Sequence, residues 1–167
     1  MFKNAHESHE HSKGVLDMLY QYDSFLDSLE VICDMGCGEG LDAKWWAELT
    51  TRDDPPEPHD YIVYAVDRDI SKLDTQTTGR IIPFQSDYDT VALPRKVDLM
   101  WSHDSFQFRL NPLNTLASWN RMMNTNGMLV LNVPMHTTYS YDRLQTRSFS
   151  GNYFTYNICN LTYMLAV

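Results

Sequence analysis

The sequence predicts an α/β domain, a three-layer sandwich whose doubly wound and mostly parallel sheet has five or six strands. Apolar runs of strand length alternate with segments of helical periodicity along the 167 residues, a length suited to a single domain. Several of these runs are almost continuously apolar, which is typical of parallel strands buried on both faces. The expected strands begin at Val31, Tyr61, Arg80, Val97 and Met128.

The first expected strand ends in a glycine-rich turn and leads directly into a helix, which we expect from Leu41 to about Thr51. Residues 31–40 read Val-Ile-Cys-Asp-Met-Gly-Cys-Gly-Glu-Gly. Alternating glycines bring the backbone close to a ligand, because a Cβ at those positions would collide with it. The free N–H groups at the start of the helix would face the same ligand.

Asp34 discriminates between two kinds of ligand. A dinucleotide site would use the spacing G-x-G-x-x-G to place a pyrophosphate at the helix N-terminus, whereas the spacing here is G-x-G-x-G. A carboxylate beside the turn would repel a diphosphate and would suit a ligand that carries an ammonium group.

The helix after the turn is expected to pack on the sheet through Leu41, Trp45 and Leu49, which share one face, while Trp46 points elsewhere. Residues 52–60 are proline-rich and acidic. They cannot continue the helix, so we expect a surface loop.

The second expected strand, residues 61–67, ends in Asp67. In nucleoside-binding α/β folds, a carboxylate at this place accepts hydrogen bonds from the ribose hydroxyls. Asp67 therefore supports a nucleoside ligand without discriminating between cofactors. Arg68, the next residue, would lie along the adenosine edge.

The segment Asp34-x-Gly36-Cys37-Gly38-x-Gly40 closely resembles motif I of the class I S-adenosylmethionine-dependent methyltransferases, which have a Rossmann-like fold of seven strands. The resemblance extends from about residue 29 to residue 134. It implies S-adenosylmethionine as the cofactor and methyl transfer, by in-line displacement at a sulfonium, as the activity. The cofactor-binding residues expected on this basis are Asp34, Gly36, Cys37, Gly38, Gly40, Asp67, Arg68, Asp87, Tyr88 and Ser102.

Two later strand ends extend the resemblance. Residues 80–87 resemble the third strand, where an acid such as Asp87 accepts from the adenine amino group and the N–H of Tyr88 meets a ring nitrogen. The alternative for Asp87 is a turn without a ligand. Residues 93–102 match the fourth strand, of the form L-P…x-D-h-h-x-S with h apolar, which ends at Ser102.

His103 follows this strand and faces the region where the methyl group should be presented, since ligands sit at the carboxyl ends of the strands. Its imidazole could take a proton from an attacking hydroxyl or amine and so be catalytic. The alternative is that His103 only lines the cofactor pocket.

The acceptor class is narrowed by what the sequence lacks. Residues 102–105 read Ser-His-Asp-Ser, unlike the Asp/Asn-Pro-Pro-Tyr/Phe of methyltransferases that act on exocyclic amines of DNA bases or on glutamine side chains. The net charge of −9 argues against a nucleic-acid backbone as the main partner. We therefore expect a small-molecule acceptor.

The single domain is expected to have three segments: a helical cap over 1–28, a cofactor-binding core over 29–134, and an aromatic-rich segment with a last helix over 135–167. His6, His9 and His11 could bind a metal, but a solvated helix start is the commoner case and we predict no metal site. The helix that opens at residues 111–112 should end with Gly127 in a left-handed conformation.

A complete member of this family adds an antiparallel hairpin of two strands after the last helix, and no residues remain here to form it. An uncovered edge at the fourth strand would favour self-association. Two alternatives to an active methyltransferase therefore stay open. One is a non-catalytic protein that binds S-adenosylmethionine or S-adenosylhomocysteine, or a truncated inactive homologue. The other is an NAD-dependent oxidoreductase, which Asp67 allows and Asp34 opposes.

The three cysteines, Cys33, Cys37 and Cys159, cannot all pair, and two of them lie in the expected first strand and turn. This distribution indicates reduced thiols and a cytoplasmic protein. The chain has no run of eighteen apolar residues and no apolar core of a signal peptide, so we expect no membrane segment.

Overall fold

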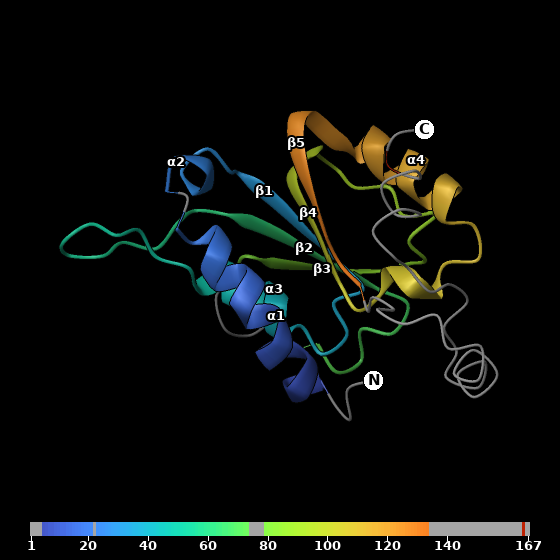
Figure 1. Cartoon of the computed structure of the whole chain (residues 1–167), viewed down its shortest axis with the longest axis horizontal. Helices are drawn as coiled ribbons and strands as arrows, with labels where there is room; N and C mark the ends of the chain where they lie inside the picture. The colour runs from blue at the N-terminus through green and yellow to red at the C-terminus, as the bar shows by residue number, and fades with distance from the viewer. Residues whose placement is uncertain (1–4, 22, 74–78, 134–164, 166–167) are drawn as a thin grey trace, which may run out of the picture.

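The computed structural model describes residues 5–21, 23–73, 79–133 and 165, and its centre is a sheet of five parallel strands in the order β3-β2-β1-β4-β5 (Figure 1). The strands are β1 (Val31–Met35), β2 (Ile62–Asp67), β3 (Ile81–Gln85), β4 (Val97–His103) and β5 (Met123–Asn132). β1 pairs with β2 on one side and with β4 on the other. This order confirms the doubly wound α/β prediction, and it places the switch in strand order at β1, where ligands of such sheets bind.

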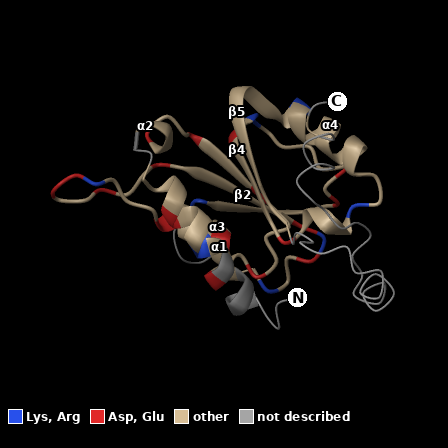
Figure 2. Cartoon of the chain, in the orientation of Figure 1, with Lys and Arg blue, Asp and Glu red and all other residues tan. Residues whose placement is uncertain are grey.

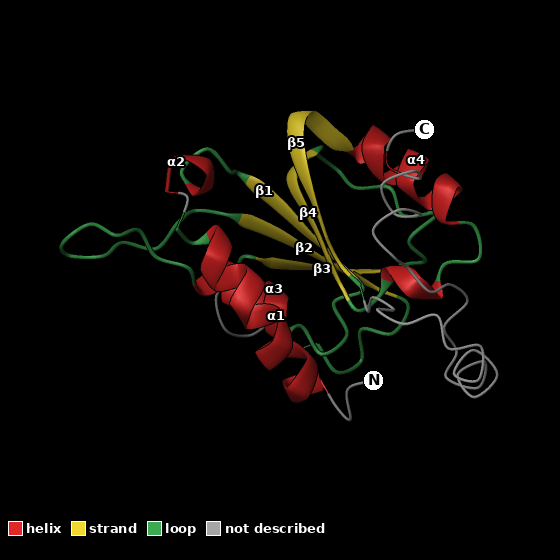
Figure 3. Cartoon of the chain, in the orientation of Figure 1, coloured by secondary structure: helices red, strands yellow, loops and turns green. Residues whose placement is uncertain are grey.

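The helices lie on both faces of the sheet (Figures 1 and 3). They are α1 (Ala5–Leu19), α2 (Asp23–Leu26), α3 (Leu41–Glu48), the short 3₁₀ helix η1 (Phe106–Phe108) and α4 (Pro112–Met122). α1 and α3 share one face and contact each other, whereas α4 lies on the opposite face. None of the helices in the described ranges combines the length and the apolar character needed to cross a membrane.

Two hydrophobic cores result, one on each face, and successive residues of β1 contribute to them alternately. Ile32 packs with the α1 and α3 side, whereas Val31, Cys33 and Met35 pack with the α4 side. Because side chains of a strand alternate between faces, the parity of Asp34 directs it toward the α1 and α3 layer. Burial on both faces explains why the strands read as continuous apolar runs.

The predicted packing face of α3 was wrong by one position. Trp46 is fully buried and Trp45 only partly so, and the inward face of the helix consists of residues 42, 43, 46 and 47. Trp46 packs edge-on against Trp101 of β4, with ring centroids 6.0 Å apart. Because this inward face includes the polar Asp42, a search for regularly spaced apolar residues does not identify it. The helix also ends at Glu48, short of Thr51.

The connection from α4 to β5 also differs from the expectation. α4 is followed at once by β5, and the left-handed residue is Asn126, with φ 67°, and not Gly127. A Cβ on Gly127 would lie 3.0 Å from the carbonyl oxygen of Asn124 and 3.2 Å from that of Val97, so this glycine permits a close backbone approach. β5 covers β4, and within the described residues β5 and not β4 lies at the sheet edge.

The loop between α3 and β2 projects from the body of the molecule and carries several of the acidic residues (Figures 1 and 2). Residues 52–58 are all exposed, as expected for the proline-rich segment. A bridge between Thr50 and Pro58 closes the base of the loop. The sheet therefore resumes after an excursion that leaves the core intact.

Candidate functional site

The glycine turn after β1 is fixed to the neighbouring strand β2. The backbone N–H groups of Gly36 and Cys37 both donate to the carbonyl oxygen of Val66, at 2.8 and 3.1 Å. Gly36, Gly38 and Gly40 have φ values of 87°, 54° and 82°, in the left-handed region that disfavours residues with a Cβ. The backbone conformation of the turn is thus sufficient by itself to favour glycine at these three positions.

The expectation that all three glycines make room for a ligand was wrong for two of them, as the atoms around each glycine show. A Cβ on Gly36 would lie 2.3 Å from Cβ of Ser105 and 2.5 Å from the hydroxyl of Tyr88, and one on Gly40 would lie 2.1 Å from Leu73. These two glycines make room for the protein's own side chains. Only Gly38 has no atom within 4 Å of such a Cβ, so it is the glycine that can face a ligand.

A cavity of about 160 Å³ lies at this end of the sheet. It is bounded by the turn, the start of α3, the end of β4 and the helix α1. Its lining residues are His9, Asp34, Gly36, Cys37, Gly38, Glu39, Leu41, Asp42, His103 and Asp104. The fold therefore brings together five residues that the sequence predicts for the site, namely Asp34, Gly36, Cys37, Gly38 and His103.

Asp34 is the most unusual group in the cavity. Its side chain is only 2% exposed, and its Oδ2 has no hydrogen-bond partner among the described residues. Burial raises the pKa of its carboxyl well above the usual range, the nearby Asp42 and Asp67 raise it further, and a hydrogen bond from the Ala43 backbone opposes them. A buried carboxylate oxygen without a partner is costly, and a cationic donor in the cavity would satisfy it.

Asp42, in the first turn of α3, is a second buried carboxylate, and its role was not predicted. Its Oδ1 lies 2.5 Å from Nδ1 of His9 and accepts from the Ser12 hydroxyl at 2.8 Å, and its Oδ2 accepts from the indole N–H of Trp101 at 2.9 Å. These three partners join α1, α3 and β4 beside the cavity. His9 and Ser12 lie more than 29 positions from Asp42, so no local motif could have identified the contact.

Asp67 lies at the carboxyl end of β2, where the sequence places it. Its Oδ2 accepts from the N–H of Gly38 at 3.0 Å, and its Oδ1 accepts from the N–H of Asp69 at 3.1 Å. Each carboxylate oxygen retains a lone pair for a further donor. Asp67 is thus both tied to the glycine turn and able to accept hydrogen bonds from a ligand.

Asp87 follows β3 and interacts with two arginines. Arg109 donates to its Oδ1 at 3.1 Å, and Nε of Arg68 lies 3.7 Å from its Oδ2, so Arg68 faces Asp87. Arg109 is 4% exposed, and its guanidinium lies over the Tyr88 ring, 4.0 Å from the centroid. The buried Arg109 was not predicted, because an arginine in a loop after β4 carries no local signal of burial.

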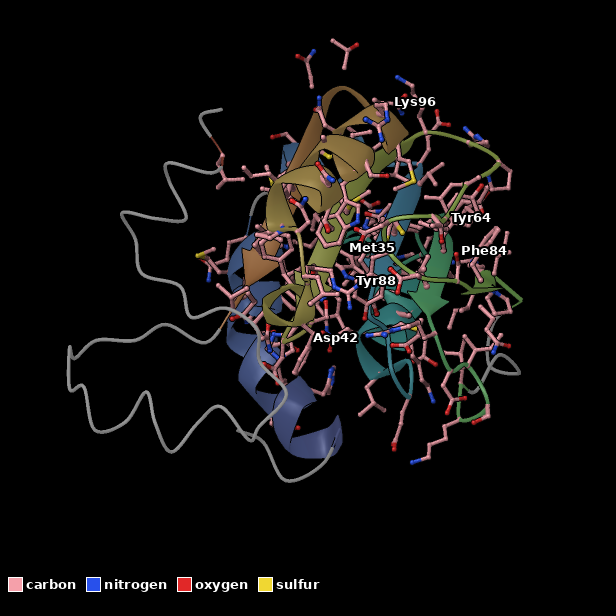
Figure 4. All side chains as sticks on the ribbon, turned by 90° about the vertical axis from the view of Figure 1, so that its right-hand side faces the viewer. Met35, Asp42, Tyr64, Phe84, Tyr88 and Lys96 are labelled. Carbon is pink, nitrogen blue, oxygen red and sulfur yellow. The ribbon has the colours of Figure 1, made fainter. Side chains whose placement is uncertain are left out.

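Figure 4 shows this end of the sheet, with Asp42 on the α1 side of the turn and Tyr88 on the α4 side, near Met35. Asp87 and Tyr88 do not line the cavity. They continue the site along the carboxyl ends of the strands beyond Asp67. Burial raises the pKa of the Tyr88 phenol, which therefore stays protonated.

Ser102, which the sequence assigns to the cofactor, is fully buried behind the turn. Its hydroxyl lies 2.7 Å from that of Ser105, and the Ser105 hydroxyl donates to the carbonyl oxygen of Met35 at 2.7 Å. The structure does not bring the Ser102 side chain to the cavity. The two serines instead connect the end of β4 to the end of β1.

His103 ends β4 and lines the cavity, with its ring stacked near Trp101 at a centroid distance of 6.5 Å. The next residue, Asp104, has φ 47° and accepts from the side-chain amide of Gln107. Cys33 and Cys37 are free thiols, and burial raises the pKa of both. Cys159 and the aromatic-rich segment lie outside the described residues, within which no group of three or more metal-ligating side chains is found.

One comparison with known proteins identifies a family. Residues 33–131 match a family model described as a methyltransferase domain, which is more than half of the chain. No curated protein matches the sequence.

Solved structures resemble the fold at low sequence identity. The YcgJ protein from Bacillus subtilis is 13% identical with a TM-score of 0.69, covering 94% of this chain and 67% of its own. CalS10, an amino pentose methyltransferase from Micromonospora echinaspora solved with S-adenosylmethionine, is 15% identical with a TM-score of 0.59, covering 82% of this chain and 59% of its own. Coclaurine N-methyltransferase, solved with N-methylheliamine and S-adenosylhomocysteine, is 17% identical with a TM-score of 0.55, covering 71% of this chain and 34% of its own. The chain thus spans about a third of the last protein and about three fifths of CalS10.

The packing at Gly36 generates a stability prediction. We expect Gly36→Ala to lower the free energy of unfolding by about 2–4 kcal/mol, because the new Cβ meets Ser105 and Tyr88 at a left-handed φ. Gly14→Ala is the matched control: this glycine lies in α1 with open space around it, so alanine should stabilise by about 0.5–1 kcal/mol. Denaturant unfolding measures both, and equal stability of the two variants would contradict the close packing.

The raised pKa of Asp34 generates a pH prediction for the protein without ligand. The folded state keeps the Asp34 proton to higher pH than the unfolded state does, so this residue reduces stability progressively as the pH rises above the ordinary carboxyl range of about 4. Asp34→Asn removes this effect and should stabilise the protein by about 1–3 kcal/mol at pH of about 8, with a smaller gain at pH of about 5. Thermal unfolding at the two pH values tests it. A variant that melts below the wild type at the higher pH would show that the Asp34 carboxylate carries no such cost.

Proposed function

Because the chain belongs to the methyltransferase domain family, we propose that it binds S-adenosylmethionine and transfers the methyl group to a small molecule. The observation that carries the proposal is the buried Asp34 carboxylate, whose Oδ2 has no partner within the described residues and lies in a cavity beside the glycine turn. A cofactor with an ammonium group supplies the missing donor. The diphosphate of NAD would instead meet a cavity lined by four acidic residues.

The described residues offer a contact for each part of this cofactor. Asp34 and the backbone at Gly38 would hold its amino-acid end, and Asp67 would accept from the ribose hydroxyls. The Tyr88 N–H and Asp87 would bind adenine. Arg68 and Arg109 already interact with Asp87, so they fix the orientation of this carboxylate before adenine arrives.

The bound cofactor supplies a methyl group activated by a sulfonium. The chain's contribution is to position the acceptor in line with that methyl group and to exclude water, which converts a bimolecular encounter into a reaction of adjacent groups. His103 lines the cavity at the end of β4. In this proposal its imidazole accepts the proton that an attacking hydroxyl or amine loses.

A small-molecule acceptor is supported by the net charge of −9 and by the acidic cavity, both unfavourable to nucleic acid. We propose that the helical cap, residues 1–28, contributes to the cofactor and acceptor site, because His9 of α1 reaches the cavity. We also propose a cytoplasmic location, which the buried free thiols of Cys33 and Cys37 support.

The cofactor proposal predicts that S-adenosylhomocysteine binds the purified protein in calorimetric titration. Asp34→Asn and Asp67→Ala should each weaken this binding about tenfold or more, since each removes a charged acceptor of a ligand hydrogen bond. Asp60→Ala, in the exposed loop before β2, is the control and should bind as the wild type does.

NAD should produce no heat under the same conditions. Binding of NAD without binding of S-adenosylhomocysteine would overturn the proposal in favour of an oxidoreductase. Binding of S-adenosylhomocysteine without methyl transfer from labelled S-adenosylmethionine to any member of an acceptor panel would favour a non-catalytic binding protein.

We further propose that the protein self-associates along β5. This strand pairs with β4 on one side, and no described strand covers its other side. Unpaired N–H and C=O groups of an edge strand favour pairing with a second chain. Light scattering should therefore give a mass above 19.5 kDa, and a proline within β5, such as Leu129→Pro, should reduce association. A monodisperse monomer at micromolar concentration would contradict the proposal.

A further inference from the structure

The lining of the cavity is rich in acids, and this limits how the cavity could hold the carboxylate of an amino-acid ligand. Four of its lining side chains are carboxylic acids, namely Asp34, Glu39, Asp42 and Asp104, and none of the described residues that line it is lysine or arginine. Such a cavity suits an ammonium and a sulfonium. The amino-acid end of S-adenosylmethionine also carries a carboxylate, which needs a donor of its own if it is to lie among these acids.

Two side chains in the cavity can carry a positive charge: His9 of α1 and His103 of β4. The structure explains the orientation of His9. Its Nδ1 lies 2.5 Å from Oδ1 of Asp42, and its side chain is 21% exposed. A carboxylate only accepts hydrogen bonds, so Nδ1 carries a proton, and Nε2 is the ring nitrogen left for a ligand.

Asp42 is itself immobilised, which makes it a precise support for His9. Ser12 donates to the same oxygen at 2.8 Å, and Trp101 donates to the other oxygen at 2.9 Å. Ser12 is fully buried, and its hydroxyl also lies 2.8 Å from the carbonyl oxygen of His9. Ser12 of α1 therefore holds Asp42 and contacts the backbone of His9, while the His9 ring itself is held by Asp42 of α3.

We propose that His9 binds the carboxylate of the cofactor's amino-acid end through Nε2–H, while Asp42 holds Nδ1–H. This inference rests on the proposed function, since it assigns one group of that cofactor to one residue. In its protonated form the imidazole donates from both nitrogens, one to Asp42 and one to the ligand. Asp34 and His9 then bind the two opposite charges of the same amino acid, and α1 forms one wall of the cofactor site.

The other groups that face His9 agree with this assignment. Glu39 and Asp42 approach from the turn and from α3, Asp34 from β1, and His103 and Asp104 from the end of β4. On its own helix, Glu10 and Lys13 are exposed. The acids on the other elements would repel a ligand carboxylate that lacked a donor such as the His9 imidazole.

The test compares three ligands by calorimetric titration: S-adenosylhomocysteine, its analogue that lacks only the carboxylate, and 5′-methylthioadenosine, which lacks the whole amino acid. His9→Ala should weaken binding of the first about tenfold or more and leave binding of the other two unchanged. His9→Gln keeps a side-chain N–H donor and should recover part of the loss. His59→Ala removes a histidine that stacks on Tyr61 away from the cavity, and it should change none of the three affinities.

The outcomes separate this inference from the proposed function. If the wild type binds none of the three ligands, the cofactor proposal itself fails. If the wild type binds them and His9→Ala weakens all three equally, His9 only supports the fold of the site, and the carboxylate assignment is overturned. Unchanged binding of S-adenosylhomocysteine by His9→Ala would overturn it as well and would leave the N–H groups at the start of α3 as the carboxylate donors.

Discussion

The close packing around Gly36 is the constraint on which the site depends. The carbonyl of Val66 from β2 accepts two N–H groups of the turn, while Ser105 after β4 and Tyr88 after β3 occupy the space that a Cβ of Gly36 would need. The end of β2 and the segments that follow β3 and β4 therefore meet at the end of β1. The absence of one side chain lets the carboxyl ends of four strands converge, and the cavity opens beside that point.

Convergence of strand ends also explains the electrostatic character of the site. Each of β1, β2 and β3 carries an acid at or just beyond its carboxyl end, in Asp34, Asp67 and Asp87. The chain neutralises only some of these charges. Asp87 has two arginines and Asp67 has two backbone N–H groups, whereas one oxygen of Asp34 has no partner among the described residues. The unpaired oxygen of Asp34 lowers the stability of the protein without ligand, and a ligand that donates to this oxygen would remove that cost.

Much of this arrangement could be read from the sequence because it depends on local patterns. Continuous apolar runs indicate parallel strands, and acids at the strand ends and alternating glycines indicate a nucleoside site; the sheet order confirms the fold. The inward face of α3 could not be read, because it includes Asp42, and an aspartate usually marks the solvent side. The buried Arg109 and the contact between His9 and Asp42 were missed for a related reason, since both join residues far apart in the chain.

The two buried acids of the cavity show how environment divides roles between like residues. Asp42 accepts from Ser12 and Trp101 and contacts His9, so its charge is satisfied by the protein and it joins three elements. Asp34 lies in the same cavity and accepts from the Ala43 backbone, but its Oδ2 has no partner among the described residues. A cation that enters gains more from Asp34 than from Asp42, because only Asp34 has a buried oxygen left to satisfy. The preference for a cationic ligand that we propose for the cavity therefore follows from the partners of the two carboxylates and not from the number of acids around it.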